Sequence, residues 1–467
     1  MRSNVPLVAL PEFRAQQNPS GVCLRTSNGT ISNAEFAAAV KAGAARLARA
    51  GVGRGDIVAV MLANRAEIII ALFAAWRLGA ALTPINPALT APEASYQISD
   101  SGAKVVIVDT DTAGRTATSD STAIFADDFA NVSGDTLVVG SNPDPTDLAL
   151  LIYTSGTTGK PKGVMLNHAN IAAMCESLIE ALQLTSSDKS LLVLPLFHAN
   201  GLIAGTISPL WAGGSVAIAP RFDPKQFWAI VGAERPTYFS AVPTMYAMLA
   251  ALGPEESADT SSLRFVVCGA APMPTATILD FEQRYGVPIV EGYGLSEGTV
   301  ASTLNPIRGI RKPGTVGLAL PGQTVAVVDE NGLALPPGER GEVVIGGPTI
   351  MSGYWNRPEA SAVALRGGVL HTGDVGFFDP DGYLVLVDRL KDMIIRGGEN
   401  IYPKEIENVK IVAMSRKITR APVSVVFTNK TLRITRTESV GIEYTISEIA
   451  MPSMYVPAPV GELTIMS

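Results

Sequence analysis

The sequence has few charged residues and no long hydrophobic segment. Asp, Glu, Lys and Arg make up 17% of its 467 residues, below the about 25% that is usual for soluble domains. The longest strongly apolar run, residues 68–76, has nine residues, about half of what a membrane-spanning helix requires. Residues 1–16 contain no uninterrupted apolar region after a basic start. We therefore expect neither a transmembrane segment nor a secretory signal.

Cysteine is also scarce, and the chain carries no net positive charge. Cys23, Cys175 and Cys268 lie far apart and form neither a disulfide framework nor a metal-ligand spacing, which is typical of a reducing compartment. The formal net charge of −7 argues against binding to nucleic acid. Hydrophobic residues account for 47% of the chain, enough for a large buried core. These features predict a globular cytoplasmic protein and leave its oligomeric state open.

Strands and helices alternate between about residue 30 and residue 300. Ser32 and Glu35 have the spacing of a capping box, which predicts a helix through Leu47 that ends at Gly51. Such alternation predicts an α/β fold of βαβ units with mainly parallel sheets, in which ligands bind at the carboxyl ends of strands. Further strands are predicted at residues 56–62, 105–108, 148–153, 191–194, 216–219 and 265–267, and further helices at residues 65–78, 171–184 and 275–285.

The pattern changes after about residue 310, where turn dipeptides separate short alternating runs. This predicts a β-rich subdomain made of hairpins. A second change begins at Val409, because the last 59 residues hold only two of the 44 glycines and carry a net charge of +3, against −10 before. Such a break indicates a different module or a disturbed reading frame. The turn dipeptides lie at residues 313–314, 321–322, 331–332, 337–338 and 381–382.

Residues 153–163, Tyr-Thr-Ser-Gly-Thr-Thr-Gly-Lys-Pro-Lys-Gly, have the composition of an anion-binding loop. Small residues let backbone N–H groups approach an anion, hydroxyl groups can donate hydrogen bonds, and Lys160 and Lys162 add positive charge. The loop is not a Walker A motif, because Pro161 follows Lys160. A plain turn is the simpler alternative, but eleven consecutive residues of this kind favour a phosphate loop. We expect it between an apolar strand and a helix that begins near Asn167.

This loop resembles the phosphate loop of the adenylate-forming superfamily, which includes acyl-CoA synthetases, 4-coumarate ligases, luciferases and nonribosomal peptide adenylation domains. Further similar segments follow in the family's order and extend the resemblance over residues 20 to about 408. The resemblance implies a large adenylation domain over residues 1–388, with a β-rich subdomain from about 311, and a small α+β domain over residues 389–467 after a hinge. The segments are residues 195–201, 269–273, 291–297, 341–358, 371–374, 388–392 and 397–403.

The resemblance implies that the large domain binds ATP and Mg²⁺. Glu297 would be the Mg²⁺ ligand and Tyr293 would stack on adenine. Asp374 would bind the ribose hydroxyls, and Arg389 would bind ribose and phosphate. Taken singly, these residues also have structural interpretations, such as an acid at a helix N-terminus, a core tyrosine or a surface ion pair. The other implied nucleotide-binding residues are Thr154, Ser155, Gly156, Thr157, Thr158, Gly159, Lys160, Gly269, Ala270, Ala271, Glu291, Gly292, Gly294 and Ser296.

Two further catalytic residues are implied, together with a site for CoA. His198 would gate the passage between an acyl pocket and a CoA channel, which favours CoA as the acyl acceptor. Lys391 occupies the hinge position, where a backbone rotation would re-aim the small domain between two half-reactions. Gly397 and Gly398 would line the path of the CoA pantetheine arm.

The sequence departs from the family after Asn408. The family's small domain is longer and carries a Gly-Lys-x-x-Arg-like motif, whose lysine bridges the carboxylate and the α-phosphate. Lys410, Lys417 and Lys430 do not lie in such a motif, so we assign no catalytic lysine. We interpret the tail as a truncated replacement of the small domain, native or frameshifted. Loss of one electrostatic contact of this kind slows a reaction by roughly 10²–10³-fold, so ATP binding could persist with little turnover.

The resemblance therefore predicts an AMP-forming ligase that joins a monocarboxylic acid to CoA through an acyl-adenylate. Two alternatives stay open: acyl loading onto a carrier-protein phosphopantetheine, and a nucleotide-binding pseudoenzyme. Gly292 precedes Tyr293, where malonyl-CoA synthetases have an arginine, which disfavours a malonate-type acid. An apolar pocket would suit an aliphatic or aromatic acid of undetermined length. Its lining would come from Phe197, Ala199, Gly201, Ile203 and Gly294.

Overall fold

The computed structural model describes residues 5–116, 121–129, 143–154, 160–253 and 258–389, together with short strands beyond residue 393. The chain divides into two units, Met1–Lys391 and Asp392–Ser467. The α+β character predicted for residues 389–467 stays a prediction, since the described residues of the second unit are all in antiparallel strands. These strands are β21 (Ile394–Arg396), β22 (Glu399–Ile401), β23 (Val423–Thr428), β24 (Thr431–Thr437) and β25 (Glu443–Thr445).

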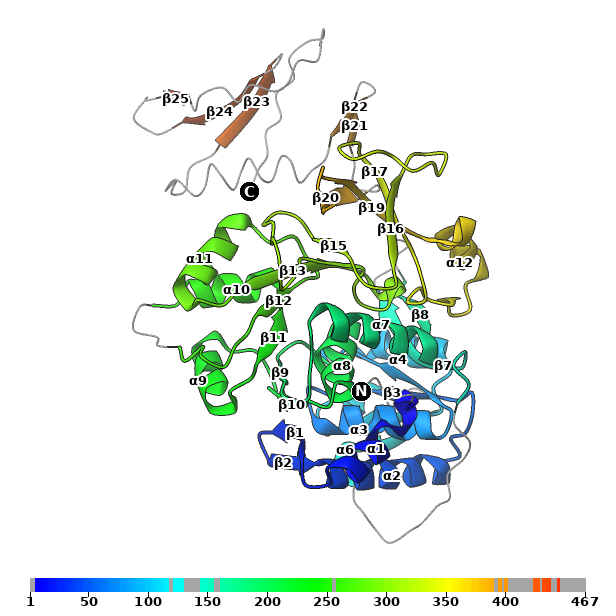
Figure 1. Ribbon diagram of the computed structural model, residues 1–467. Coiled ribbons are helices and arrows are strands. Elements are labelled where there is room, and N and C mark those ends of the chain that lie inside the picture. Colours follow the sequence, from blue (N-terminus) through cyan, green and yellow to red (C-terminus); the bar gives the residue numbers. More distant parts are fainter. Residues whose placement is uncertain are drawn as a thin grey trace. The chain divides into compact units, whose positions relative to one another are not determined.

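A large mixed sheet runs through the first unit, with nine strands among the described residues (Figure 1). Its order is β15-β14-β13-β12-β11-β9-β10-β1-β2, and the strands from β13 to β1 are parallel to their neighbours. The outer strands pair antiparallel. The strands are β1 (Val22–Thr26), β2 (Gly29–Ser32), β9 (Lys189–Leu192), β10 (Ser215–Ile218), β11 (Tyr238–Ala241), β12 (Val266–Cys268), β13 (Ile289–Tyr293), β14 (Thr303–Leu304) and β15 (Leu318–Ala319).

Three helices cover one face of this sheet: α9 (Pro224–Glu234), α10 (Pro243–Ala250) and α11 (Thr275–Tyr285). They bury aromatic residues such as Trp228 and Phe281 against the strands. Alternation of buried strands with apolar helix faces is the arrangement expected of βαβ units, because each parallel strand pair needs a crossover.

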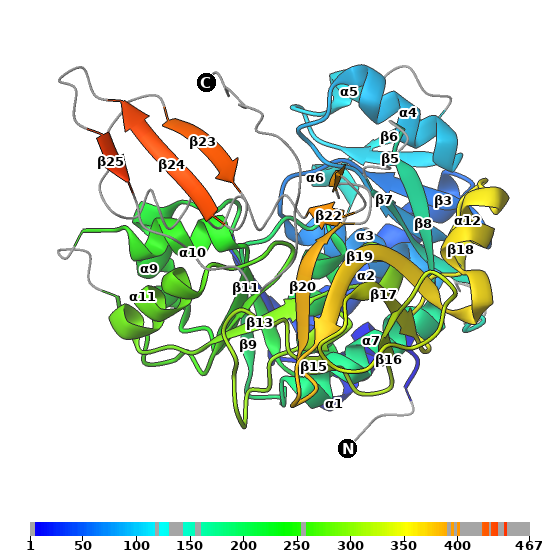
Figure 2. The same ribbon diagram turned by 90° about the horizontal axis from the view of Figure 1, so that it is seen from above.

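A second mixed sheet has the strand order β18-β8-β7-β4-β3-β5-β6 in the described part of the chain. Alternate residues of β3 face different cores: Val58 and Val60 pack with α3 (Ala66–Arg77), whereas Ile57 and Ala59 pack with α4 (Ala91–Ser101) (Figure 2). The sheet is therefore covered on both faces, as parallel strands require. The strands are β3 (Ile57–Val60), β4 (Ala81–Pro84), β5 (Val105–Val108), β6 (Thr122–Phe125), β7 (Leu148–Thr154), β8 (Lys162–Asn167) and β18 (Gly353–Tyr354).

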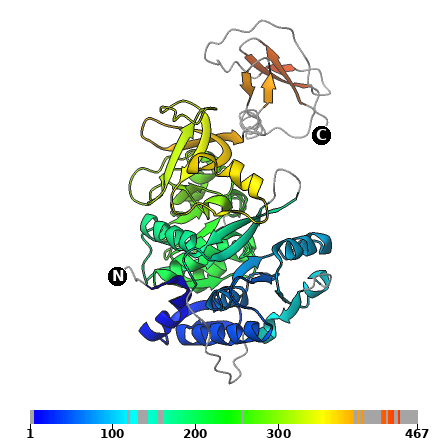
Figure 3. The same ribbon diagram turned by 90° about the vertical axis from the view of Figure 1, so that its right-hand side faces the viewer.

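The predicted β-rich subdomain is present as a four-stranded antiparallel sheet, β16-β17-β19-β20. Within the first unit it lies at the opposite end from the N-terminal helices (Figures 1 and 3). All five predicted turn dipeptides contain a glycine with positive φ, among them Gly332 (+79°) and Gly382 (+82°). Such angles are accessible to glycine at little cost. The strands are β16 (Thr324–Val328), β17 (Gly341–Gly346), β19 (Leu370–Phe378) and β20 (Leu384–Arg389).

The remaining helices complete the first unit. They are η1 (Leu7–Ala9), α1 (Leu10–Gln17), α2 (Asn33–Arg49), α5 (Ala113–Thr116), α6 (Ala126–Phe129), α7 (His168–Ala181), η2 (Asn200–Ile207), α8 (Ser208–Trp211), η3 (Ser296–Gly298), α12 (Pro358–Ala364) and η4 (Arg366–Gly368). None of the helices in the described part of the chain has both the length and the apolar character that crossing a membrane needs.

The predicted capping box at the start of α2 is confirmed. The Glu35 backbone N–H donates to Ser32 Oγ over 3.2 Å, and the Ser32 N–H donates to Glu35 Oε2 over 2.8 Å. The helix ends at Arg49, and Gly51 follows with a φ of +81°. The local sequence therefore fixed both ends of this helix.

The helix predicted to begin near Asn167 is confirmed, and the structure adds a strand before it that the sequence did not predict. The helix α7 does begin at His168, with Asn167 as its N-cap. However, β8 lies between the loop and the helix and pairs antiparallel with β7. The apolar run of Val164, Met165 and Leu166 is only three residues long, too short for the sequence alone to mark a strand. The loop thus connects a hairpin, and no helix begins directly after it.

All three cysteines are free and buried. Cys268 ends β12, is 1% exposed and belongs to the core. Burial raises the pKa of the Cys175 thiol to about 12, so this side chain acts as a small apolar group.

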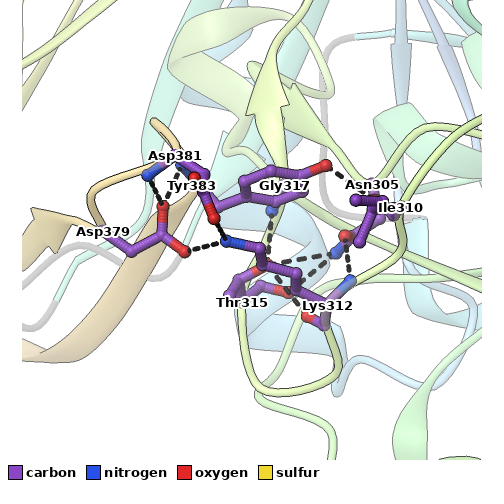
Figure 4. Close-up of polar contacts among 8 residues, drawn as sticks. All are labelled: Asn305, Ile310, Lys312, Thr315, Gly317, Asp379, Asp381 and Tyr383. Atoms are coloured by element: carbon purple, nitrogen blue, oxygen red, sulfur yellow. Dashed lines mark hydrogen bonds and ion pairs between the residues drawn. The ribbon is translucent and has the colours of Figure 1, made fainter.

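Polar contacts connect the nine-stranded sheet to the β19–β20 hairpin (Figure 4). Lys312, which follows β14, places its Nζ 2.6 Å from Asp379 Oδ2 and also contacts Asp381. The Tyr383 hydroxyl donates to the Ile310 carbonyl over 2.6 Å. These contacts hold the β19–β20 hairpin beside β14, the strand that follows β13. The candidate site is built from residues of the same hairpin and of β13.

We expect Ser32→Ala to lower the free energy of unfolding of the first unit by about 1 kcal/mol, because an N-cap side chain is lost. Urea denaturation followed by circular dichroism measures this change. Ser27→Ala, in the exposed turn after β1, is the control and should leave the transition midpoint unchanged. Equal midpoints for the two variants would show that the capping box contributes nothing.

Candidate active site

Two predicted nucleotide-binding segments lie side by side at the carboxyl ends of β12 and β13. Cys268 pairs in register with Glu291, and a Cβ on Gly269 would lie 3.5 Å from the Gly292 carbonyl oxygen. Ala270 has a φ of +70°, an angle that few non-glycine residues adopt. The expected position at the carboxyl edge of parallel strands is therefore confirmed for residues 269–271 and 291–294.

Tyr293, Asp374 and Arg389 form one hydrogen-bonded cluster. The Tyr293 hydroxyl donates to Asp374 Oδ2 over 2.6 Å, and Arg389 Nε lies 3.1 Å from Asp374 Oδ1. The pairing of β19 with β20 places Asp374 opposite Arg389. The residue Asp374 is 8% exposed, and a buried carboxylate needs partners of this kind. Three predicted residues are thus brought together, with Tyr293 and Asp374 separated by 81 positions in sequence.

The electrostatics of this cluster keep Tyr293 protonated. Burial, followed by the neighbouring Asp374 charge, raises the pKa of Tyr293 well above its usual range. Burial also raises the pKa of Asp374, while the hydrogen bond from Tyr293 and the positive charge of Arg389 oppose this shift. The cluster can therefore present a carboxylate whose oxygens accept hydrogen bonds from vicinal hydroxyl groups.

The backbone around Tyr293 is tightly packed. A Cβ on Gly294 would lie 2.3 Å from the Val300 carbonyl oxygen, so only glycine fits at this position. Glu291 is 7% exposed and accepts a hydrogen bond from the Gly314 N–H over 3.4 Å. The side chain of Glu291, a predicted nucleotide-binding residue, is therefore buried and hydrogen-bonded to the protein backbone.

Glu297 lies in η3, directly after the predicted residue Ser296. Its Oε1 accepts a hydrogen bond from the Tyr354 hydroxyl over 2.9 Å, and its backbone carbonyl accepts one from the Met351 N–H over 2.8 Å. Tyr354 in turn lies beneath Lys162, whose Nζ is 5.1 Å from the ring centroid. The Glu297 carboxylate is thus held from one side.

The described residues offer a Mg²⁺ ion one protein carboxylate as a ligand, that of Glu297. No group of three or more His, Cys, Asp or Glu side chains that could hold a metal occurs among them. Mg²⁺ in nucleotide sites commonly takes one or two carboxylates and completes its coordination with phosphate and water oxygens. Glu297 alone would therefore suffice beside a nucleotide.

The described ends of the phosphate loop are Thr154, the last residue of β7, and the exposed Lys160. Lys160 Nζ lies 5.6 Å from the ring centroid of Tyr96 in α4. The other predicted residues of the loop, Ser155, Gly156, Thr157, Thr158 and Gly159, lie outside the described residues, as do Lys391, Gly397 and Gly398.

Residues without a predicted role support the ends of this loop. Asp100 accepts hydrogen bonds from the Tyr153 hydroxyl (2.8 Å) and from Arg357 Nη2 (2.7 Å). Arg357 and Tyr354 lie within the 341–358 segment that resembles the family. For Asp100 and Tyr96 the single sequence carries no signal, since α4 shows only the pattern of a surface helix.

The segment with His198 leads into a π-helical turn, η2. His198 is exposed, and its ring centroid is 4.4 Å from that of Phe197. A Cβ on Gly201 would lie 2.4 Å from the Pro195 carbonyl oxygen, so glycine is needed there. Among the residues expected to line an acyl pocket, Ile203 is fully buried in the main core. Short π-helical turns are rare and often occur at functional sites.

Residues 12–355 match the model of a family described as AMP-binding enzyme. The chain belongs to this family. A feruloyl-CoA synthase from Amycolatopsis sp is 39% identical over 87% of the chain and 83% of that protein. A long-chain-fatty-acid–CoA ligase from Bacillus subtilis is 34% identical over 76% of the chain and 72% of that protein.

Solved AMP-binding relatives share the fold. The O-succinylbenzoate coenzyme A synthetase MenE from Bacillus subtilis, in complex with ATP and magnesium ion, has a TM-score of 0.81 and 31% sequence identity. The similarity covers 91% of this chain and 88% of that one. The resemblance inferred from the ordered segments is therefore confirmed.

We expect Asp374→Asn to raise the dissociation constant for ATP by at least about tenfold, because hydrogen bonds to a charged group are worth about 1.5–3 kcal/mol. The amide would also leave the donors of Tyr293 and Arg389 without their charged acceptor. Calorimetric titration with ATP measures the change. Asp280→Asn, on the exposed side of α11, is the control, and an equal ATP affinity of the two variants would exclude Asp374 from the nucleotide site.

Proposed function

We propose that this protein is an AMP-forming acid–CoA ligase. It activates a monocarboxylic acid with ATP to an acyl-adenylate, releasing pyrophosphate, and then transfers the acyl group to the CoA thiol, releasing AMP. The observation that carries this proposal is the cluster of Tyr293, Asp374 and Arg389 at the edge of β13, in a chain whose relatives are CoA ligases.

Each residue has a task that follows from the chemistry. A carboxylate must attack the α-phosphate of ATP, although both are anions that repel each other in water. The phosphate loop from Thr154 to Lys160 would hold the β- and γ-phosphates, and Glu297 would hold the Mg²⁺ that spreads their charge. Asp374 would fix the ribose, so that the α-phosphate meets the acid in a defined orientation.

In the second half-reaction the CoA thiol would attack the acyl carbonyl, and AMP would leave. His198, exposed at the start of η2, would gate the passage between the acyl pocket and CoA. Lys391 would serve as the hinge, and Gly397 and Gly398 would line the path of the pantetheine arm.

An aliphatic or aromatic acid with one carboxylate suits the residues near the site. A Cβ on Gly292 would lie 2.8 Å from Leu304 Cδ1 and 3.0 Å from the Thr303 carbonyl oxygen. A side chain at position 292 would have to displace Leu304, and the glycine found there provides no basic group to pair with a second carboxylate. The names of the relatives, a feruloyl-CoA synthase and a long-chain-fatty-acid–CoA ligase, support both classes of acid.

We expect pyrophosphate release from ATP and Mg²⁺ to depend on an added acid, and acyl-CoA to appear when CoA is present. The panel contains hydroxycinnamic acids, fatty acids of increasing length, malonate and oxalate. Glu297→Gln should lower the rate by about a hundredfold or more, because charge stabilisation is lost. Glu330→Gln, in the exposed turn after β16, should behave like the unmodified protein.

The same assay shows how the proposal could fail. If the protein binds ATP but releases no pyrophosphate with any acid, it is a nucleotide-binding protein without turnover. Acid-dependent pyrophosphate release without acyl-CoA formation would instead indicate a different thiol acceptor, such as a phosphopantetheine on a carrier protein. A preference for malonate or oxalate would refute the assignment of a monocarboxylic acid.

A further inference from the structure

One segment of the first unit contacts several parts of the candidate site, yet the proposed function gives it no task. It comprises residues 353–357, from β18 to the start of α12, and we call it the brace. The strand β18 extends the seven-stranded sheet by pairing with β8, with Tyr354 opposite Val164. The Trp355 N–H donates to the Gly163 carbonyl over 2.8 Å. The brace therefore lies along the strand that leads out of the phosphate loop.

One side of the brace holds the proposed magnesium ligand. The Tyr354 hydroxyl donates to Glu297 Oε1 over 2.9 Å, and the Tyr354 N–H donates to Ser361 Oγ over 2.8 Å. A charge-assisted hydrogen bond of this kind restricts the direction in which the carboxylate points.

The other side of the brace holds both ends of the phosphate loop through α4. Arg357 Nη2 lies 2.7 Å from Asp100 Oδ1 and 3.3 Å from the Tyr96 hydroxyl. Asp100 Oδ2 accepts a hydrogen bond from Tyr153, directly before Thr154, over 2.8 Å. Tyr96 donates to the carbonyl of Pro161, directly after Lys160, over 3.1 Å. A single guanidinium thus connects to the residues on both flanks.

The backbone of the brace allows these two functions. Asn356 has a φ of +52°, a left-handed conformation that asparagine tolerates better than most residues. This bend lies between Trp355, whose Nε1 donates to the Asp100 carbonyl over 3.0 Å, and Arg357, which reaches the carboxylate of the same residue. Both side chains therefore meet the end of α4.

We propose that the brace sets the position of Glu297 relative to the ends of β7 and β8, with Tyr354 and Arg357 as positioning residues. The inference rests on the proposed function for the identity of the nucleotide. Its physical content is that the proposed metal ligand and the strands on both sides of the predicted phosphate loop are held by one short segment, through two separate sets of hydrogen bonds. Each set can be removed without the other.

Removal of the Tyr354 hydroxyl tests the first set. With Tyr354→Phe, we expect the Mg²⁺ concentration that half-saturates ATP binding to rise about tenfold, while ATP binding in EDTA stays unchanged. Titration of the full chain with ATP at increasing MgCl2 gives both values. Tyr285→Phe is the matched control, since its hydroxyl donates to the Leu249 carbonyl over 2.6 Å at the end of α11. A lower melting temperature without a change in Mg²⁺ dependence would overturn the role of Tyr354.

Removal of the Arg357 guanidinium tests the second set. With Arg357→Ala, we expect ATP affinity to fall about tenfold both with Mg²⁺ and in EDTA, because the flanks of the phosphate loop lose their support. Arg357→Lys keeps a charge beside Asp100 and should recover part of the affinity, which a merely structural effect on folding would not predict. Arg54→Ala is the control, since Arg54 pairs with Asp147 at the opposite end of β7 over 2.8 Å. Unchanged ATP affinity in Arg357→Ala would overturn the proposal.

These measurements need neither an acid nor CoA, so they separate the two proposals. If the unmodified protein binds ATP with Mg²⁺ but makes no acyl-adenylate, the proposed function fails and the binding data still decide on the brace. If Tyr354→Phe and Arg357→Ala have the same effect with and without Mg²⁺, the two sets of hydrogen bonds are not separate, and the proposal is wrong in that form.

Discussion

The buried carboxylate of Asp374 is the constraint on which the candidate site depends. It accepts a hydrogen bond from Tyr293 at the end of β13 and pairs with Arg389 at the end of β20. Because a buried carboxylate without partners is costly, these contacts favour the arrangement in which the nine-stranded and four-stranded sheets meet at this point. The same arrangement collects a carboxylate, a phenol and a guanidinium, which suit a ribose and a phosphate group.

A second carboxylate, Asp100, has a comparable role beside the predicted phosphate loop. Its carboxylate oxygens accept hydrogen bonds from Tyr153 and Arg357. Residues of α4, β7 and the segment before α12 therefore meet at one side chain. Both carboxylates work by the same physics, because each is held at two oxygens by donors from different elements. The site is thus built where sheets and helices join, while the strands themselves supply a rigid base.

Much of the fold was predictable because its signals are local. The capping box at Ser32 and the turn glycine Gly382 act within a few residues, so the sequence pattern alone predicts the helix start and the hairpin. The strand β8 was not predicted, since its apolar run from Val164 to Leu166 is too short to indicate a strand before β7 pairs with it. Strand identity there depends on a partner, which local sequence does not specify.

The sequence by itself determined the order of the family-like segments, the residue types of the site and the positions of its turns. Only the tertiary structure decided which side chains meet: Asp100 with Arg357, 257 residues apart, and Glu297 with Tyr354, 57 residues apart. The physical reason is that such contacts follow from the order and register of strands in a sheet. These are set by packing of the whole unit, whereas periodicity and turn chemistry act over only a few residues.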